Sequence, residues 1–151
     1  MNVLAPVKSI MTKDLITVNP KDKLIVIKEI FDTHNIHHIP VVRYKTIVGL
    51  ISKSDFLHFT RGFHRSEEDQ FVNDARLRAY NAEDLMTEGL AKLEEEDRIN
   101  VALEIFLANR FHAIPVVKEN ELVGILTTYD VIQALAKETV SAEQILSNKK
   151  E

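Results

Sequence analysis

Two copies of one short pattern place a hydroxyl side chain three residues before an aspartate. In the pattern G-h-h-[ST]-x-x-D, where h is apolar, one copy ends on Ser52 and Asp55 and the other on Thr127 and Asp130. A carboxylate can accept hydrogen bonds from a sugar diol, and a hydroxyl beside a helix N-terminus can bind phosphate oxygens. The same residue types are also ordinary helix N-caps. The two roles are compatible, and the pattern alone leaves both open.

Histidines precede a repeated apolar run, because residues 37–42 are HHIPVV and residues 112–117 are HAIPVV. Their imidazoles could contact phosphate, bind a metal ion, or be half-buried polar groups at the mouth of a cleft. Adjacent residues of a strand point to opposite faces, so His37 and His38 cannot both bind one metal ion. At an ordinary pKa of about 6.5 they would be mostly neutral at pH 7. We predict no metal site.

Both patterns belong to a longer internal repeat. A shift of 75 positions aligns residues 10–57 with residues 85–132 without a gap, and 16 of the 48 aligned pairs are identical. A fixed period indicates copies of one supersecondary unit. We therefore expect a first repeat over residues 1–60, a helical connector over 61–80, a second repeat over 81–138, and a tail over 139–151 that contains a short helix.

Helices are indicated by capping residues and by apolar spacing. Asn81 and Asp84 predict a capping box for the short helix that opens the second repeat, and Ser66 predicts another in the connector. Asp22 and Asp97 are the predicted N-caps of two longer helices, whose apolar residues recur on one face.

Strands are expected at 16–18, 39–42 and 46–51 of the first repeat, with turns at RYKT and, in the second repeat, at KENE. Gly49 and Gly124 fall inside strands, where glycine marks a bulge or a close approach of other atoms. The apolar run after the histidines predicts a strand covered on both faces. The fold class is therefore α+β (mixed α/β), with two pseudo-symmetric units packed sheet to sheet and a cleft on their axis.

The ordered sets IMT…HHIPVV…IVGLISKSD and LMT…HAIPVV…LVGILTTYD resemble the cystathionine-beta-synthase (CBS) domain, which occurs as tandem pairs called Bateman modules. The resemblance covers about 130 of the 151 residues. It implies two βαββα cores face to face, a homodimer, and an adenine nucleotide (AMP, ADP or ATP) bound between the repeats as a regulatory ligand. It also implies a stand-alone module that is not an enzyme, requires no cofactor, and controls a separate protein.

The resemblance further implies which residues bind the ligand. Aspartate is expected at ribose, serine or threonine at ribose or phosphate, and the facing wall comes from the other repeat. The first cleft then combines Thr127, Asp130, Ile16, Thr17, Val18, His37, His38, Ile39 and Pro40. The second combines Ser52, Asp55, Lys92, Leu93, His112, Ala113, Ile114 and Pro115. Family members that hold phosphate strongly often have arginine at the position of His38, whose counterpart here is Ala113. We therefore expect two inequivalent clefts.

Composition argues against several functional classes of protein. The net charge of −4 argues against a nucleic-acid binder, and no apolar run approaches the roughly 20 residues of a membrane helix. The absence of cysteine fits a cytoplasmic protein. Only four glycines are present, without a phosphate-binding loop, and no catalytic set is predicted. The alternative to nucleotide binding is an interaction or dimerisation module without a ligand.

Overall fold

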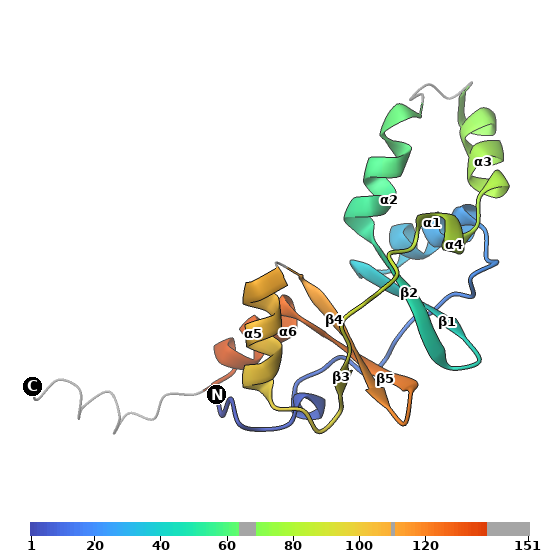
Figure 1. Cartoon of the computed structure of the whole chain (residues 1–151). Helices are drawn as coiled ribbons and strands as arrows, with labels where there is room; N and C mark the ends of the chain where they lie inside the picture. Colours follow the sequence, from blue (N-terminus) through green and yellow to red (C-terminus); the bar gives the residue numbers. More distant parts are fainter. Residues whose placement is uncertain (64–68, 110, 139–151) are drawn as a thin grey trace, which may run out of the picture.

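The computed structural model of the chain describes residues 1–63, 69–109 and 111–138. Two small sheets lie against each other through β2 and β5, and helices cover their outer sides (Figure 1). This arrangement confirms the predicted α+β class. The predicted tail helix within 139–151 and the predicted cap at Ser66 lie outside the described residues.

The first half of the chain contains a short 3-10 helix, two helices around a hairpin, and a helical connector. Its elements are η1 (Val7–Ser9), α1 (Leu24–Thr33), β1 (His38–Arg43), β2 (Thr46–Ser52), α2 (Lys53–Phe59), η2 (Thr60–Gly62) and α3 (Gln70–Ala79). The second half repeats the order after the connector. Its elements are α4 (Ala82–Leu85), β3 (Leu93–Glu94), α5 (Ile99–Asn109), β4 (Ala113–Lys118), β5 (Glu121–Thr127) and α6 (Thr128–Ala136).

Each sheet is built on one antiparallel hairpin. β1 pairs with β2 and β4 with β5, and a register shift falls beside Gly49 and Gly124, as the sequence predicted. The first strand of each unit is shorter than expected, because Val18 forms a single parallel bridge to Val41 and β3 has two residues. The predicted turns are confirmed, and Tyr44 and Lys45 adopt φ of 48° and 69°, the left-handed pair of a type I′ turn.

The two repeats exchange their leading segments, which are the residues before the first strand of each repeat (about 1–16 and 81–91): each segment packs on the other repeat. Val7 and Met11 belong to the hydrophobic core of the second repeat, and Ala82 belongs to the core of the first. Isolated antiparallel bridges join Thr12 to Ile125 and Leu50 to Thr87. The exchange explains both strand glycines, since a Cβ at Gly49 or Gly124 would lie closer than 3.0 Å to the sulfur of Met86 or Met11.

The predicted N-caps Asp22 and Asp97 are wrong. Helix α1 begins at Leu24 after Lys23, and α5 begins at Ile99. Each aspartate instead accepts a hydrogen bond from the backbone N–H three residues earlier, Asn19 at 2.7 Å and Glu94 at 2.8 Å, and so closes the turn before the helix. In the predicted box at the start of α4, Asp84 Oδ2 does accept from the Asn81 N–H at 2.7 Å.

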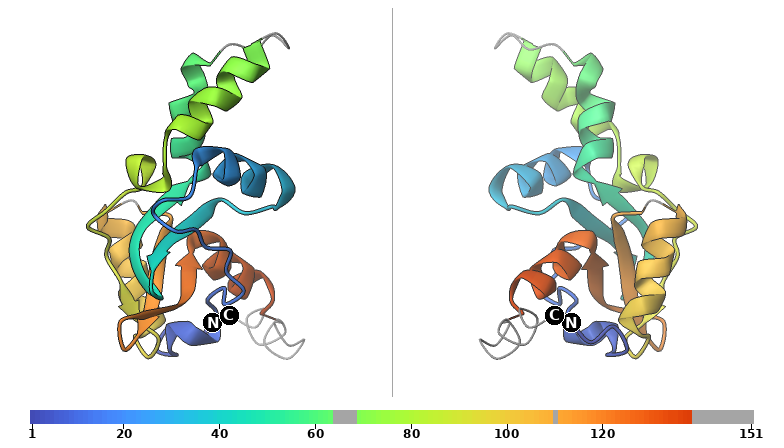
Figure 2. Two further views of the ribbon diagram at one scale, coloured as in Figure 1. Left: turned by 90° about the vertical axis from the view of Figure 1, so that its right-hand side faces the viewer. Right: turned by 90° about the vertical axis from the view of Figure 1, so that its left-hand side faces the viewer.

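In the described part of the connector, α3 stands beside α2, and the two helices form an arm beyond the sheets (Figures 1 and 2). Aromatic contacts join the two helices of the arm. The Phe59 ring centroid, at the end of α2, lies 5.8 Å from that of Phe63 and 5.3 Å from that of Tyr80, which follows α3. Arg76 lies over the Phe63 ring at 5.6 Å, and Leu77 anchors α3 in the first core. No helix in the described ranges is long and apolar enough to cross a bilayer.

Candidate ligand-binding cleft

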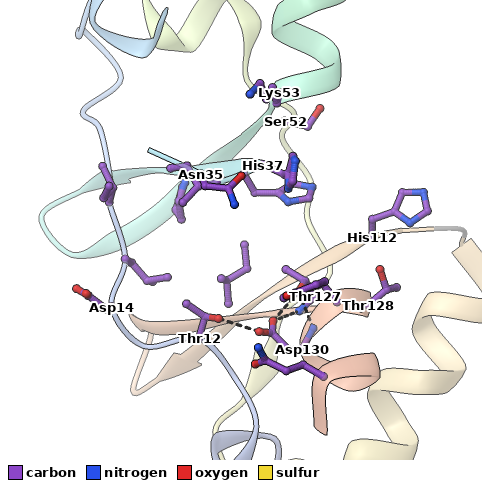
Figure 3. A pocket seen from close by; sticks show the side chains of 18 of the residues that line it. Thr12, Asp14, Asn35, His37, Ser52, Lys53, His112, Thr127, Thr128 and Asp130 are labelled. Carbon is purple, nitrogen blue, oxygen red and sulfur yellow. Dashed lines mark hydrogen bonds between the residues drawn. The ribbon is translucent and has the colours of Figure 1, made fainter. Parts of the chain in front are cut away.

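A cavity of about 760 Å³ lies between the two repeats (Figure 3). Its walls come from the leading segment, from the start of β1, and from the junctions β2–α2 and β5–α6. The lining residues are Thr12, Asp14, Leu15, Ile16, Asn35, Ile36, His37, His38, Pro40, Ser52, Lys53, Ser54, His112, Ile125, Thr127, Thr128, Tyr129, Asp130 and Gln133.

Strand register brings the histidines next to the hydroxyl residues. In the first hairpin His38 is opposite Ser52, and in the second Ala113 is opposite Thr127. The hairpin pairing extends by one more hydrogen bond beyond each of these pairs. The Lys53 N–H donates to the His37 carbonyl at 2.8 Å, and the Thr128 N–H donates to the His112 carbonyl at 3.1 Å. Each HxIPVV run therefore begins where a helix N-terminus opens toward the cavity.

One end of the cavity is built around the carboxylate of Asp130. Asp130 is 8% exposed and is the only charged side chain buried in the described part of the chain. Its Oδ1 accepts from the Thr12 hydroxyl at 2.8 Å, and its Oδ2 accepts from the Thr127 hydroxyl at 2.6 Å and the Thr127 N–H at 2.7 Å. The Thr127 hydroxyl accepts in turn from the Asp130 N–H at 3.1 Å. The result is a complete capping box at the start of α6.

The equivalent aspartate of the first repeat, Asp55, lies outside the cavity lining and accepts fewer hydrogen bonds. Asp55 is exposed, and in the described structure its Oδ2 accepts from the Ser52 hydroxyl at 2.7 Å. The Asp55 N–H donates to the Ser52 hydroxyl oxygen at 3.0 Å. Thr87 is the counterpart of Thr12, but among the described residues its hydroxyl makes no hydrogen bond to Asp55. Ser52 and Thr127 are thus the N-caps of α2 and α6, and the capping role that the sequence pattern allowed is present in both copies.

The charges facing the cavity come from both repeats. Burial lowers the pKa of His38 below 6.5, the nearby His37 and His112 lower it further, and Asp55 opposes the shift. Lys53 is a cation in the lining, while Asp14 and Asp130 are the lining carboxylates. His38 is therefore neutral at pH 7, and anion binding would favour its protonated form.

The structure brings eight of the predicted site residues to this one cavity, from both predicted clefts. They are Ile16, His37, His38, Pro40, Ser52, His112, Thr127 and Asp130. The other predicted residues are not among its lining. Val18, Ile39, Leu93 and Ile114 are core residues with at most 4% of their surface exposed. Ala113 and Pro115 follow His112 into β4, and Thr17, Asp55 and Lys92 are exposed outside the lining.

Sequence reasoning missed most of the leading segment and the first turns of the helices. Lys53 was expected to contribute to the second cleft, and the residues not predicted are Thr12, Asp14, Leu15, Asn35, Ile36, Ser54, Ile125, Thr128, Tyr129 and Gln133. The doubled Met-Thr at 11–12 and 86–87 was the available signal for Thr12. The exchange of leading segments places Thr12 beside Asp130, and this tertiary contact leaves no pattern in a single sequence.

Comparison with known proteins identifies the family. The model of the CBS domain matches twice, over residues 7–62 and 82–137, and the chain belongs to this family. An uncharacterized protein of Methanocaldococcus jannaschii is 27% identical over 127 residues, which are 83% of this chain and 45% of that protein. Inosine-5'-monophosphate dehydrogenase of the same organism is 29% identical over 126 residues, 82% of this chain and 22% of the enzyme. The chain thus spans less than half the length of these relatives.

Solved structures of CBS-pair proteins have the same fold. CBSX2 from Arabidopsis thaliana superimposes with a TM-score of 0.73 at 24% identity, over 88% of this chain and 95% of that one. An uncharacterized conserved protein from Pyrococcus horikoshii gives a TM-score of 0.74 at 22% identity, over 94% of this chain and all of that one. A further structure of CBSX2 is a complex with AMP. No group of three or more His, Cys, Asp or Glu that could hold a metal ion occurs in the described ranges.

Proposed function

We propose that the chain is a regulatory module that binds an adenine nucleotide in the cavity between its two CBS repeats. The observation that carries the proposal is the composition of one cavity. It combines a capped carboxylate end at Thr127 and Asp130 with a cluster of histidines and a lysine at its other side (Figure 3). Sugar hydroxyls and phosphate oxygens need these two kinds of partner.

The apolar part of the lining suits a planar base. Ile16, Pro40 and Ile125 reach the cavity from the leading segment, β1 and β5. Binding sites of small ligands are mostly apolar with a few polar groups that fix orientation, and this cavity has that composition. Adenine between these side chains would leave the ribose toward Asp130.

Phosphate groups would then face His37, His38, His112 and Lys53. Among the described lining residues Lys53 is the one fixed cation, and the other three groups are imidazoles, so a nucleotide with few phosphates fits better than a highly charged one. We expect AMP to bind more tightly than ATP for this reason.

The relatives support an adenine-containing ligand. CBSX2 has been solved with AMP, and the CBS domain pair of protein MJ0100 has been solved with 5-methylthioadenosine and S-adenosyl-L-methionine. Both superimpose on this chain with TM-scores of 0.72. Control of a partner protein would follow if the ligand binds one conformation of the pair better than another.

Thermal unfolding with AMP, ADP, ATP, S-adenosylmethionine and adenosine tests the proposal. A ligand at 100 times its Kd adds about 2.7 kcal/mol to the free energy of unfolding, which is a readily measured rise in Tm. Guanosine monophosphate serves as the control ligand. The absence of a shift with every adenine compound at millimolar concentration, in folded protein, would contradict the proposal.

A second candidate is a ligand-free interaction module, favoured by an exposed apolar stripe on α6. Tyr129, Ile132 and Leu135 recur at three-residue spacing and are 67%, 62% and 49% exposed. A homodimer that buries this stripe is proposed here. Sedimentation of the wild type and of Ile132→Glu distinguishes the cases: the second candidate requires a dimer that the variant loses, with no response to nucleotides.

A further inference from the structure

Asp130 has too few free acceptor positions to hold a ribose diol in the observed arrangement. An ionised carboxylate offers about four lone-pair positions. Three are occupied, one on Oδ1 by the Thr12 hydroxyl and two on Oδ2 by the hydroxyl and the N–H of Thr127. One position remains on Oδ1. A diol donates two hydrogen bonds, so one present donor must leave before both can be accepted.

Thr12 is the donor that can leave at least cost. The two groups of Thr127 are part of the capping box, and its hydroxyl also accepts from the Asp130 N–H. Thr12 is exposed, and its hydroxyl makes one hydrogen bond in the described structure, the bond to Asp130 (Figure 3). A rotation about its χ1 would break that bond without moving the main chain.

The main chain of Thr12 is held independently of its hydroxyl. Its N–H donates to the Ile125 carbonyl and its carbonyl accepts from the Ile125 N–H, both at 2.9 Å. Met11, the residue before it, packs in the core of the second repeat. The hydroxyl is therefore kept beside Asp130 by the exchange of leading segments, whether or not it is bonded.

We propose that the Thr12 hydroxyl competes with a ribose diol for Asp130 and thereby lowers the affinity of the cavity for ribonucleotides. This inference rests on the proposed function, because it assigns the ribose to the Asp130 end. Thr12 is a specificity-determining residue under this account, since it disfavours the second hydrogen bond that distinguishes a ribose from a deoxyribose.

Calorimetric titration of the full chain with AMP and with 2'-deoxy-AMP tests the inference. Thr12→Val keeps the shape of the side chain and removes the donor, so it should bind AMP about tenfold more tightly than the wild type, the effect of about one hydrogen bond. Its affinity for 2'-deoxy-AMP should change much less. Thr12→Ser keeps the hydroxyl and should match the wild type, and Thr17→Val, outside the lining, is the matched control.

Each result decides between the accounts. AMP affinity that is unchanged or weaker in Thr12→Val, or a gain that is equal for both ligands, overturns this inference while the proposed function stands. Binding of neither ligand to any variant overturns this inference, and the proposed function falls with it if the other adenine compounds of the thermal panel also give no shift. If Thr12→Val does not fold, the methyl resonance of Thr12 in the wild type replaces it. That resonance should move on addition of AMP more than on addition of 2'-deoxy-AMP, and equal movement contradicts competition.

Discussion

Asp130 and Asp55 occupy the same position of one repeated sequence pattern, but their carboxylates differ in hydrogen bonding and burial. At the Asp130 end a threonine from the exchanged segment completes the set, and the carboxylate is buried. At the Asp55 end the equivalent Thr87 is not bonded to the carboxylate, which is exposed. An internal repeat can thus produce one buried and one exposed copy of the same motif, and the difference arises in the segment contributed by the other repeat.

The largest difference between the ends should appear when the carboxylates are removed. Asp130→Ala leaves the Thr12 and Thr127 donors without their acceptor at a buried position, and we expect it to lower the free energy of unfolding by about 3 kcal/mol. Asp55→Ala removes the exposed hydrogen bond from the Ser52 hydroxyl, keeps the N-cap itself, and should lower the free energy of unfolding by less than about 1 kcal/mol. Urea denaturation measures both. Equal losses would show that the two ends are energetically equivalent.

The exchange itself is tested at the two strand glycines. The atoms nearest to a Cβ at Gly49 would be the Cβ, Cγ and Sδ of Met86, whereas those nearest to a Cβ at Gly124 would be the Cγ, Sδ and Cε of Met11, which can move aside more easily. Gly49→Ala should therefore destabilise by about 1–2 kcal/mol through overpacking, and Gly124→Ala by less.

Gly62→Ala is the control for this pair, because a Cβ there meets nothing within 4 Å. Thermal unfolding of the three variants gives the order. Met86→Ala combined with Gly49→Ala should recover part of the loss caused by the added methyl group. A loss at Gly62 as large as that at Gly49 would contradict the packing argument.

The threonines of the leading segments should differ in the same direction as the carboxylates. Thr12→Val removes a hydrogen bond to a buried carboxylate and should lower the free energy of unfolding by about 1 kcal/mol. Thr87→Val removes no side-chain hydrogen bond to Asp55 and should change it by less than about 0.5 kcal/mol. Denaturation at one pH with both variants in parallel measures the difference, and a greater loss at Thr87 would reverse our assignment of the closed end.

The smallest effect concerns pH and the position where the repeats differ, His38 against Ala113. The folded-state pKa of His38 is lowered below its ordinary 6.5, first by burial, so the unfolded chain binds the proton more readily. Its contribution to stability is therefore present above about pH 6.5 and is lost as pH falls below that value.

His38→Ala makes the first repeat resemble the second and should reduce the fall in Tm between pH 7.5 and pH 5.5. His58→Ala, an exposed residue of α2 outside the cavity, is the control and should leave that fall unchanged. A larger fall in His38→Ala than in the wild type would mean that protonated His38 is favoured in the folded state.

The local patterns of the sequence were sufficient for the fold class and for part of the site. The spacing of glycine, hydroxyl residue and aspartate predicted that Thr127 and Asp130 lie at a strand-to-helix junction, and IPVV predicted a buried strand. These features depend on neighbours close in the chain, and a single sequence records them directly.

Features that depend on distant neighbours were not predictable in this way. Asp22 looks like an N-cap in sequence, but the turn that it closes is fixed by the Asn19 N–H, and the helix starts after Lys23. The doubling of the motif predicts two clefts, and residues of both sets, such as Ser52 and Thr127, line the cavity described above. The second cleft stays a prediction. Each leading segment packs against the other repeat, and such a tertiary contact leaves no periodic signal in the sequence.

Calorimetric titration of the full-length chain with AMP at pH 7 tests the central claim most directly, because it measures both binding and the equivalence of the two ends. The account predicts saturable binding with one tight site per chain, because one cavity combines Asp130 with the histidines and Lys53. Any second site should be at least about tenfold weaker, because Asp55 is exposed outside that lining. Two sites of equal affinity, or no heat of binding in folded protein at millimolar AMP, would contradict it.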